Sequence, residues 1–280
     1  MNEIIDAHHH CWQLSRPECR WPTPALEPLY RDLGPADFWA EASSCGVSGS
    51  ILVQSQPHLD DTQYLLTLAE RDPRILGVVG WVDLSASNAV QTVHELADHP
   101  RLCGIRPMLQ DLGEDDWILR RARPDALAAL AERKLVFDAL VTPRQLPVIH
   151  ALARHHPTLS IVLDHGGKPN IAQGEMEQWT QHLAALASKP NVACKLSGLA
   201  TEMMPAQPAE AMNDYIDRIL TLFGPKRVLW GSDWPVLTLN SHYADWLARA
   251  RERVRLRCPE QEAAVFGGNA RVVYGLAPKS

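Results

Sequence analysis

The chain carries eight short, nearly continuous hydrophobic runs that are spaced along its whole length. They lie around Ile4 and in segments that begin at Gly49, Ile75, Leu102, Lys134, Leu159, Asn191 and Lys226. Hydrophobic and polar residues do not alternate within these runs, as is typical of parallel strands that are buried on both faces. The pattern therefore predicts eight parallel strands.

Most segments between these runs have the hydrophobic spacing of helices. Tyr64, Leu65, Leu68 and Ala69 form one apolar stripe, which ends shortly before a proline. Six further helical segments are predicted at residues 85–100, 143–157, 174–190, 208–225, 241–254 and 259–276. The first of these opens at Ser85, which we expect to cap the helix.

This alternation of strands and helices predicts a closed (β/α)8 barrel, a TIM barrel, in a single domain over residues 1–280. The alternative is an open, doubly wound sheet, which usually has a glycine-rich loop after its first strand. His8, His9 and His10 occupy that place here. The least regular stretch, residues 11–35, is long for a loop of a barrel, and we expect it to cover a site.

The composition is that of a soluble globular protein and narrows the range of partners. Hydrophobic residues make up 46% of the chain and charged residues 21%, and the net charge of -6 argues against nucleic acid as a partner. No apolar run approaches the about 18 residues of a membrane span, and the start MNEIIDAHHH lacks the pattern of a signal peptide. We expect a cytoplasmic protein whose six scattered cysteines are reduced thiols.

Polar or ionisable side chains stand at the carboxyl ends of nearly all the predicted strands. In chain order these are Asp6, His8 and His10; Gln54 and Gln56; Trp81 and Asp83; Arg106; Asp138; Asp164 and His165; Lys195 and Ser197; and Ser232 and Asp233. In a barrel these ends meet at one mouth, where active sites lie. Because buried charge is costly, this convergence predicts a functional site.

His8 and His10 are two residues apart, so both side chains point to the same side of an extended strand. Two imidazoles on one face can bind a divalent cation, or hold and orient a water molecule. We expect Asp6 on the same face, as an acceptor that orients an imidazole, and His9 on the other face. The pattern H-x-H also fits a solvated terminus, but the hydrophobic residues on both sides argue against a loose tail.

Four other residues each have a chemical and a structural interpretation. Asp233 can activate water or bind a metal, or it can cap a helix. His165 lies in VLDHGGKP, which also fits a capped turn. Lys195 is flanked by apolar residues and is poorly placed to reach solvent, and Arg106 could anchor a loop.

Three motifs follow one another along the chain: I-D-A-H-x-H at the start, L-D-H-x-G-K-P in the second half and R-V-L-W-G-S-D-W-P near the end. Together they resemble the amidohydrolase superfamily, in its amidohydrolase-2 branch. The terminal F-G-G-N-A-R-x-x-Y-G-L resembles the closing helix of that branch, so the resemblance spans essentially the whole chain. Within the branch, I-D-A-H-H-H-x-W and V-G-W-V-D-L are most similar to sugar lactonases of the L-fuconolactonase and L-rhamnonolactonase type.

The resemblance implies a catalytic centre of His8, His10, His165 and Asp233, with Asp233 as the general base for the hydrolytic water. The same four residues would hold one divalent metal ion, for which zinc is expected. The carbamylated lysine of binuclear relatives is absent from the ends of the fourth and fifth strands, so two bridged metals are not expected. Some relatives in this branch work without metal, which leaves open whether turnover requires it.

The resemblance also implies a substrate and the residues that hold it. Arg106 and Lys195 would polarise the lactone carbonyl or hold sugar oxygens, and Gln54, Trp81 and Trp12 would form walls of the pocket. The expected reaction opens a small sugar-acid lactone, L-fuconolactone or a related aldonolactone, to the free acid. The sugar, the ring size and the oligomeric state stay open.

Two alternatives stay open beside the lactonase. A metal-dependent decarboxylase of an aromatic or unsaturated carboxylic acid would use the same H-x-H pair and aspartate, and such lyases occur in the same branch. It would release carbon dioxide, whereas a lactonase only acidifies the solution. The other alternative is a barrel that binds a ligand without turnover, and the ring of polar strand ends argues against it.

Overall fold

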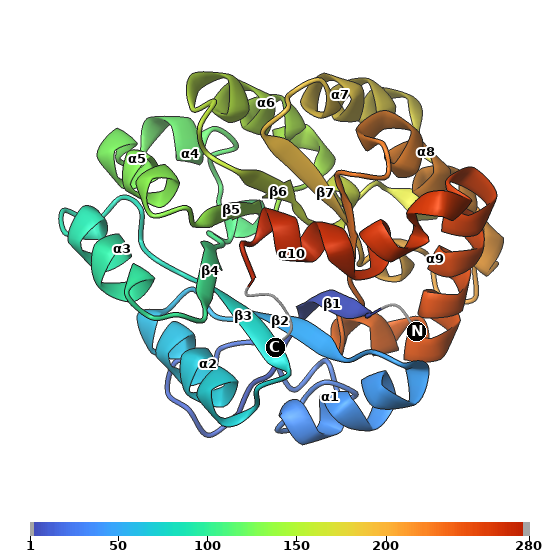
Figure 1. Ribbon diagram of the computed structural model, residues 1–280, viewed down its shortest axis with the longest axis horizontal. Helices are drawn as coiled ribbons and strands as arrows, with labels where there is room; N and C mark the ends of the chain where they lie inside the picture. The colour runs from blue at the N-terminus through green and yellow to red at the C-terminus, as the bar shows by residue number, and fades with distance from the viewer. Residues whose placement is uncertain (1–2, 277–280) are drawn as a thin grey trace.

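Eight parallel strands form a barrel in the computed structural model, which describes residues 3–276 (Figure 1). The strands are β1 (Ile5–His9), β2 (Gly49–Val53), β3 (Ile75–Gly80), β4 (Leu102–Ile105), β5 (Val136–Ala139), β6 (Ile161–Leu163), β7 (Val192–Leu196) and β8 (Val228–Trp230). They pair in chain order, and the segment after β8 returns to β1, where His10 N–H donates to Trp234 O (2.8 Å) and Asp233 N–H to His8 O (2.8 Å). All eight predicted strands are confirmed, and the open sheet is excluded. Residues 1–2 and 277–280 of the predicted domain lie outside the described residues.

Helices surround the barrel in Figure 1. They are α1 (Pro35–Ala42), α2 (Leu59–Arg71), α3 (Ala89–Ala97), α4 (Trp117–Arg120), α5 (Pro124–Glu132), α6 (Leu146–His155), α7 (Glu177–Ala187), α8 (Asn213–Phe223), α9 (Tyr243–Arg257) and α10 (Asn269–Val273). Each predicted helical segment contains one of them. Helices α1, α4 and α5 were not predicted: α1 and α4 have only eight and four residues, and in α5 the apolar residues run without a break from Ala126 to Ala131, so no stripe stands out.

The predicted cap of α3 is wrong. The helix begins at Ala89, directly after Asn88, and not near Ser85. The Ser85 hydroxyl instead donates to Asp83 Oδ1 (2.6 Å) in the loop after β3. A serine two residues after an aspartate satisfies that carboxylate locally, which competes with capping.

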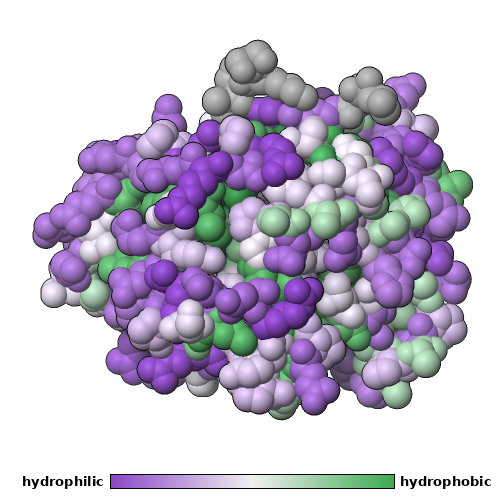
Figure 2. Space-filling model, turned by 90° about the horizontal axis from the view of Figure 1, so that it is seen from below, coloured by the Kyte–Doolittle hydropathy of each residue, from purple (hydrophilic) through white to green (hydrophobic). Residues whose placement is uncertain are grey.

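The surface fits the composition. Figure 2 shows a face on which hydrophilic residues predominate and hydrophobic residues are scattered between them. Within residues 3–276, no helix has both the length and the hydrophobicity needed to cross a bilayer. All six cysteines are unpaired, as predicted.

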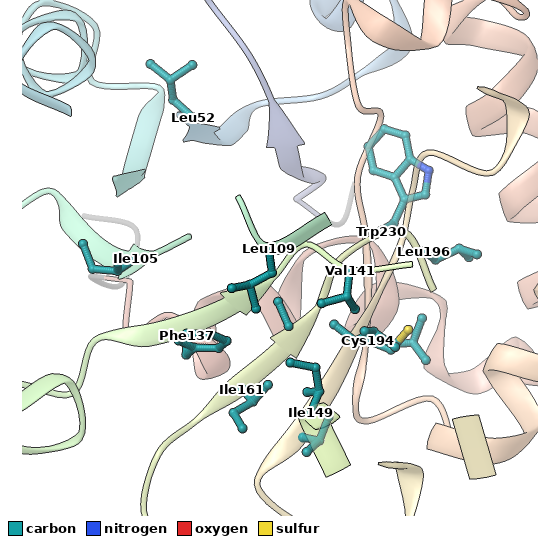
Figure 3. Close-up of a cluster of buried hydrophobic side chains, with 14 of the residues drawn as sticks. Leu52, Ile105, Leu109, Phe137, Val141, Ile149, Ile161, Cys194, Leu196 and Trp230 are labelled. Carbon is teal, nitrogen blue, oxygen red and sulfur yellow. The ribbon is translucent and has the colours of Figure 1, made fainter. Parts of the chain in front are cut away.

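The hydrophobic core has two layers on either side of the strands. The barrel interior contains residues such as Ile51, Val136 and Leu229. The layer between the strands and the helices contains the strand side chains that point away from the barrel axis, and Figure 3 shows Phe137 and Trp230 among them. Because successive side chains alternate between the two layers, each strand end presents one residue to the barrel axis.

The amino-terminal end of the barrel is closed by a π-helical turn (Ala264–Gly268) and α10. Gly267 lies so close to β1 that a Cβ atom there would be 2.9 Å from Glu3 O, which explains a glycine at this point. Beyond α10, Tyr274 enters the barrel, and its hydroxyl donates to Asp138 Oδ2 (2.8 Å) on β5. Tyr274 therefore contacts the charged interior beneath the site.

Asp217 links α8 to α9 and provides a test of the fold. Its carboxylate accepts hydrogen bonds from Arg253 Nε (2.9 Å) and from the Arg257 guanidinium. Burial raises the pKa of this carboxyl, but the two guanidinium groups outweigh burial and hold the pKa below its ordinary value of 3.8. We expect Asp217→Asn to lower the free energy of unfolding at pH 7 by about 1–2 kcal/mol, because two charged hydrogen bonds are lost, one of them to the half-exposed Arg257.

The sign of the pH dependence follows from the lowered pKa of Asp217. A carboxyl of this kind stabilises the fold above its unfolded-state pKa, and the contribution is lost as the pH falls through its folded-state pKa. Denaturant unfolding curves should therefore separate wild type from Asp217→Asn at pH 7, and the separation should shrink as the pH falls below about 4 toward the lowered folded-state pKa. An equal separation at pH 7 and pH 3 would contradict the assignment.

Candidate active site

Loops at the carboxyl ends of the strands enclose a cavity of about 520 Å³. Its polar floor includes His10, Arg106, His165 and Asp233, which come from four different strand ends. Its walls include Arg20, Trp21, Leu26, Gln56, Lys168 and Leu239. The segment 11–35 therefore covers the site, as its irregular sequence predicted.

The first strand delivers His8 and His10 to the barrel axis, with 3.2 Å between their Nε2 atoms. His9 points away, hydrogen bonds Ser50 Oγ (3.0 Å) and stacks on Phe38. His10 Nδ1 lies 2.9 Å from the Val53 carbonyl oxygen. Since a carbonyl only accepts, His10 carries its proton on Nδ1 and presents the Nε2 lone pair to the centre.

The expectation for Asp6 is wrong. The pairing of β1 with β2 shifts register between Asp6 and His9, so Asp6 does not share a face with His8. Its carboxylate accepts from the His8 backbone N–H (3.1 Å), the Ser232 N–H (2.8 Å) and the Tyr243 hydroxyl (2.8 Å). Asp6 thus positions the backbone of both strands that carry the site, and not an imidazole.

Asp233 follows β8 and stands over the histidines. Its Oδ1 atom lies 3.2 Å from His10 Nε2, 3.5 Å from His8 Nε2 and 3.9 Å from His165 Nε2. The residue has φ +61°, a left-handed conformation that an aspartate tolerates better than most residues. Its carboxylate therefore faces the histidine rings and does not cap a helix.

His165 reaches the centre from a left-handed turn after β6. His165, Gly166, Gly167 and Lys168 all have positive φ, which explains the two glycines of the DHGGKP motif. His165 Nδ1 hydrogen bonds Ser197 Oγ (2.9 Å) on the loop after β7. This contact fixes the ring so that Nε2 faces Asp233.

Burial sets the charges of the centre. It lowers the pKa of His165 to about 4, and burial followed by Lys195 lowers that of His8 well below its usual range. Burial raises the pKa of the Asp233 carboxyl, but the electrostatic effect of His165, followed by that of His8, outweighs burial and holds that pKa well below its usual range. The Asp233 carboxyl is thus ionised at neutral pH, whereas burial disfavours the charged form of the His8 and His165 rings.

A buried ion network lies beneath these rings. Lys195 Nζ donates to Asp138 Oδ2 (2.5 Å) and lies 3.1 Å from Asp164 Oδ1. Burial lowers the pKa of Lys195, but the two carboxylates outweigh it and raise that pKa, so the ammonium stays charged. The Arg106 guanidinium lies 3.5 Å from Asp164 Oδ2 and donates to the Gln54 carbonyl. Each buried charge therefore has an opposite charge nearby, as buried ions require.

Four other predicted residues do not line the cavity. Lys195 is fully buried, and Gln54 donates to the Arg106 carbonyl (2.7 Å). The Trp12 indole donates to Arg31 O (2.9 Å), and the backbone N–H of Trp81 donates to Thr62 Oγ1 (2.8 Å). None of these four contributes to the cavity lining within the described chain. Their geometry favours supporting roles, whereas Arg106 does reach the cavity.

Sequence reasoning missed several cavity residues. Trp21 and Arg20 lie in the covering segment, and nothing in its composition indicates which residues face inward. Lys168 could have been identified from the sequence, because it belongs to the DHGGKP motif that also contains His165. Asp164 appeared among the strand ends but was not assigned a role, although its carboxylate is within 3.4 Å of His8 Nδ1.

Gln56 holds the covering segment in place. Its side-chain amide donates to Trp21 O (2.6 Å) and accepts from the N–H groups of Arg20 (2.9 Å) and Trp21 (3.2 Å). We expect Gln56→Leu to raise KM about tenfold with kcat changed less than about threefold, because the wall loosens while the reacting groups stay in place. Gln56→Glu keeps the acceptor oxygen but loses the donor, so its KM should lie between those of wild type and Gln56→Leu. A fall in kcat with an unchanged KM, measured by steady-state kinetics, would contradict this role.

The centre suits one divalent metal ion. His8 Nε2, His10 Nε2 and Asp233 Oδ1 are 3.2–3.5 Å apart, close to the about 3.3 Å between ligands of a tetrahedral zinc ion with bonds of about 2.0–2.1 Å. Two nitrogens and one oxygen, with an open side toward the cavity, are typical of a catalytic zinc site. His165 Nε2, 3.9 Å from Asp233 Oδ1, is a candidate fourth ligand.

Comparison with known proteins places these features in a family. The sequence model of the amidohydrolase family matches residues 5–276. An L-fucono-1,5-lactonase from Burkholderia ambifaria is 45% identical over 276 residues, which cover 97% of this chain and 95% of that protein. Two crystal structures of an amidohydrolase from Burkholderia multivorans, one with bound HEPES and one with bound zinc, have TM-scores of 0.92 and 0.90 at 32% and 33% identity. Each comparison covers 98% of this chain and 100% of the other.

Proposed function

The chain belongs to the amidohydrolase family, and we propose on that premise that it hydrolyses a sugar-acid lactone, L-fucono-1,5-lactone or a close relative, to the free acid. The observation that carries the proposal is the 45% identity to an L-fucono-1,5-lactonase over 97% of this chain. The geometry supports it independently, since the buried carboxylate of Asp233 and the rings of His10 and His165 line the floor of a cavity sized for a small molecule, and His8 lies directly against them.

Asp233 is the general base of the proposed reaction. A water molecule beside Asp233 Oδ1 would also lie near the Nε2 lone pair of His10, so both atoms can accept its protons and aim its oxygen at the lactone carbonyl. Asp233 takes one proton as the water attacks. When the ring C–O bond breaks, the same carboxyl returns the proton to the departing alkoxide oxygen.

Arg106 is the cation at the cavity floor and stabilises the oxyanion. Its guanidinium is held by the Gln54 carbonyl and by Asp164, so it is oriented before the substrate arrives. His8, His10, Asp233 and His165 would hold a divalent metal ion, which would add Lewis-acid polarisation of the carbonyl. Zinc is the ion we propose, since the donors are imidazole and carboxylate.

The walls of the cavity suit a sugar ring. Arg20, Gln110 and Lys168 can hydrogen bond to hydroxyl groups, and Trp21 and Leu239 offer apolar surface. Such a mixture fits a molecule with one polar and one less polar face. The wall residues would therefore determine which lactone binds, while the residues of the floor carry out the reaction.

A pH-indicator assay tests the function directly. The panel contains L-fucono-, D-arabinono-, L-galactono- and L-rhamnonolactones, each measured with and without prior chelator treatment. Acidification above the spontaneous rate for one stereochemical series is the expected result, and chelator resistance would make the metal dispensable. No enzymatic acidification with any lactone, together with release of carbon dioxide from a carboxylated substrate, would replace the lactonase by a decarboxylase.

We also propose that the protein works in a reducing compartment, the cytoplasm. Its six cysteines are all unpaired, and burial raises the pKa of the Cys11, Cys103 and Cys194 thiols far above the ordinary value.

A further inference from the structure

The inner nitrogen of His8 faces a donor and an acceptor at once. Lys195 Nζ lies 3.1 Å from His8 Nδ1, and Asp164 Oδ1 lies 3.4 Å from the same atom. An ammonium group only donates, so its contact requires a lone pair on Nδ1. A carboxylate only accepts, so the contact with Asp164 requires a proton there. The two neighbours therefore favour opposite tautomers of His8.

The outer nitrogen of His8 faces mostly acceptors. The Nε2 lone pair of His10 lies 3.2 Å away and Asp233 Oδ1 lies 3.5 Å away. If His8 Nε2 also carried a lone pair, three electron-rich atoms would face one another with nothing between them, unless a cation occupied the centre. The one donor nearby, Arg106 Nη1 at 3.3 Å, has Asp164 Oδ2 as an alternative acceptor at 3.5 Å.

We propose that Lys195 holds His8 in the Nε2-protonated tautomer when no cation is bound, and thereby opposes cation binding at the centre. To ligate a metal through Nε2, His8 must move its proton to Nδ1, where the proton meets the Lys195 ammonium. Asp164 supports the metal-ready tautomer and Lys195 the metal-free one. Lys195 is thus a positioning residue that acts through His8.

The position of Lys195 is fixed, which gives it this influence. The side chain is fully buried, and Asp138 Oδ2 accepts from it at 2.5 Å. Asp138 is in turn held by the Tyr274 hydroxyl at the base of the barrel. Since the ammonium cannot swing away to water, its contact with Nδ1 persists for as long as the network is intact.

The tautomer also affects the proposed lactone hydrolysis, and this step rests on that function. In the metal-free form, the centre has an Nε2–H donor on His8 beside an Nε2 acceptor on His10. A donor next to an acceptor can bind a developing oxyanion and a water molecule side by side. Lys195 thereby prepares the centre to work without a metal ion.

Zinc affinity tests the proposal without any use of lactone turnover. We expect Lys195→Met to lower the zinc dissociation constant about tenfold or more, a change of about 1.4 kcal/mol, because Nδ1 can then carry a proton toward Asp164. Lys195→Met/Asp138→Asn keeps the net charge of the buried cluster and should show the same gain. The double variant also keeps the proposal testable if Lys195→Met alone does not fold. Lys168→Met removes a lysine of the same cavity whose Nζ lies 3.6 Å from Glu202 Oε1, and should change zinc affinity less than about threefold.

Equilibrium dialysis with elemental analysis gives the affinities, and 15N NMR of the metal-free protein gives the tautomer. The His8 signals are identified by their loss in His8→Gln. A directly bonded proton on Nε2 in wild type and on Nδ1 in the double variant supports the proposal. A proton on Nδ1 in wild type, or unchanged zinc affinity in the double variant, overturns it. The lactone panel can fail while these results hold, so the two proposals are tested separately.

Discussion

Asp233→Asn should reduce kcat for lactone hydrolysis by about 10³-fold, within the range that a general base contributes. The amide cannot accept a proton from water, but it fills the same space and can still accept from a neighbouring imidazole. Asparagine also tolerates the left-handed conformation at φ +61°, so the backbone that carries the side chain should not move. The loss should therefore appear in kcat and not in the fold.

Two measurements separate this loss from damage to the structure. Thermal unfolding of Asp233→Asn should give a Tm within about 3 °C of wild type, equivalent to about 1 kcal/mol in a chain of this size. Asp245→Asn removes an exposed carboxylate on α9 and should keep wild-type kinetics. Wild-type turnover in Asp233→Asn would exclude the residue as the base, and a collapse of Tm would show that its role is structural.

The strands and the residues at their ends could be predicted from the sequence for one physical reason. A parallel strand is buried on both faces, so it appears as a continuous hydrophobic run, and a polar residue at its end is conspicuous. This reasoning identified His8, His10, His165 and Asp233. In the structure, the Nε2 atoms of the three histidines lie 3.2–3.9 Å from Asp233 Oδ1. Their catalytic roles stay a prediction.

Side-chain direction could not be predicted where the backbone is irregular. A strict two-residue period places Asp6 beside His8, but the register shift in β1 turns Asp6 to the outside, toward Tyr243. The depth of Lys195 is a related case. The sequence indicated that it does not reach solvent, but its partners Asp138 and Asp164 come from the ends of two other strands, and only the closed barrel brings them together.

The conformation of the covering segment could not be predicted from the sequence, for a different reason. Residues 11–35 have no periodicity, so their conformation depends on tertiary contacts such as the three hydrogen bonds of Gln56. Substrate selection depends on walls of this kind, and the reaction depends on strand ends. The chemistry of this protein is therefore easier to infer from its sequence than its choice of sugar.

Gly198→Ala should reduce kcat/KM about 100-fold, because it displaces His165 without touching the substrate. Gly198 has φ +63°, and a Cβ atom there would lie 2.4 Å from His165 Nδ1, the atom that hydrogen bonds Ser197. The ring must move or rotate, and its Nε2 atom then no longer faces Asp233. A displacement of about 1 Å in a catalytic group commonly costs about 100-fold in rate.

Gly174→Ala is the matched control for this experiment. Gly174 also has a positive φ, +68°, and a Cβ atom there would meet nothing within 4 Å. Both variants should lose about 1–2 kcal/mol of stability, because each forces a residue with a Cβ atom into the left-handed region. Only Gly198→Ala should also lose activity, since only its Cβ atom reaches the centre. Equal losses of activity in the two variants would mean that backbone strain, and not the position of His165, limits the reaction.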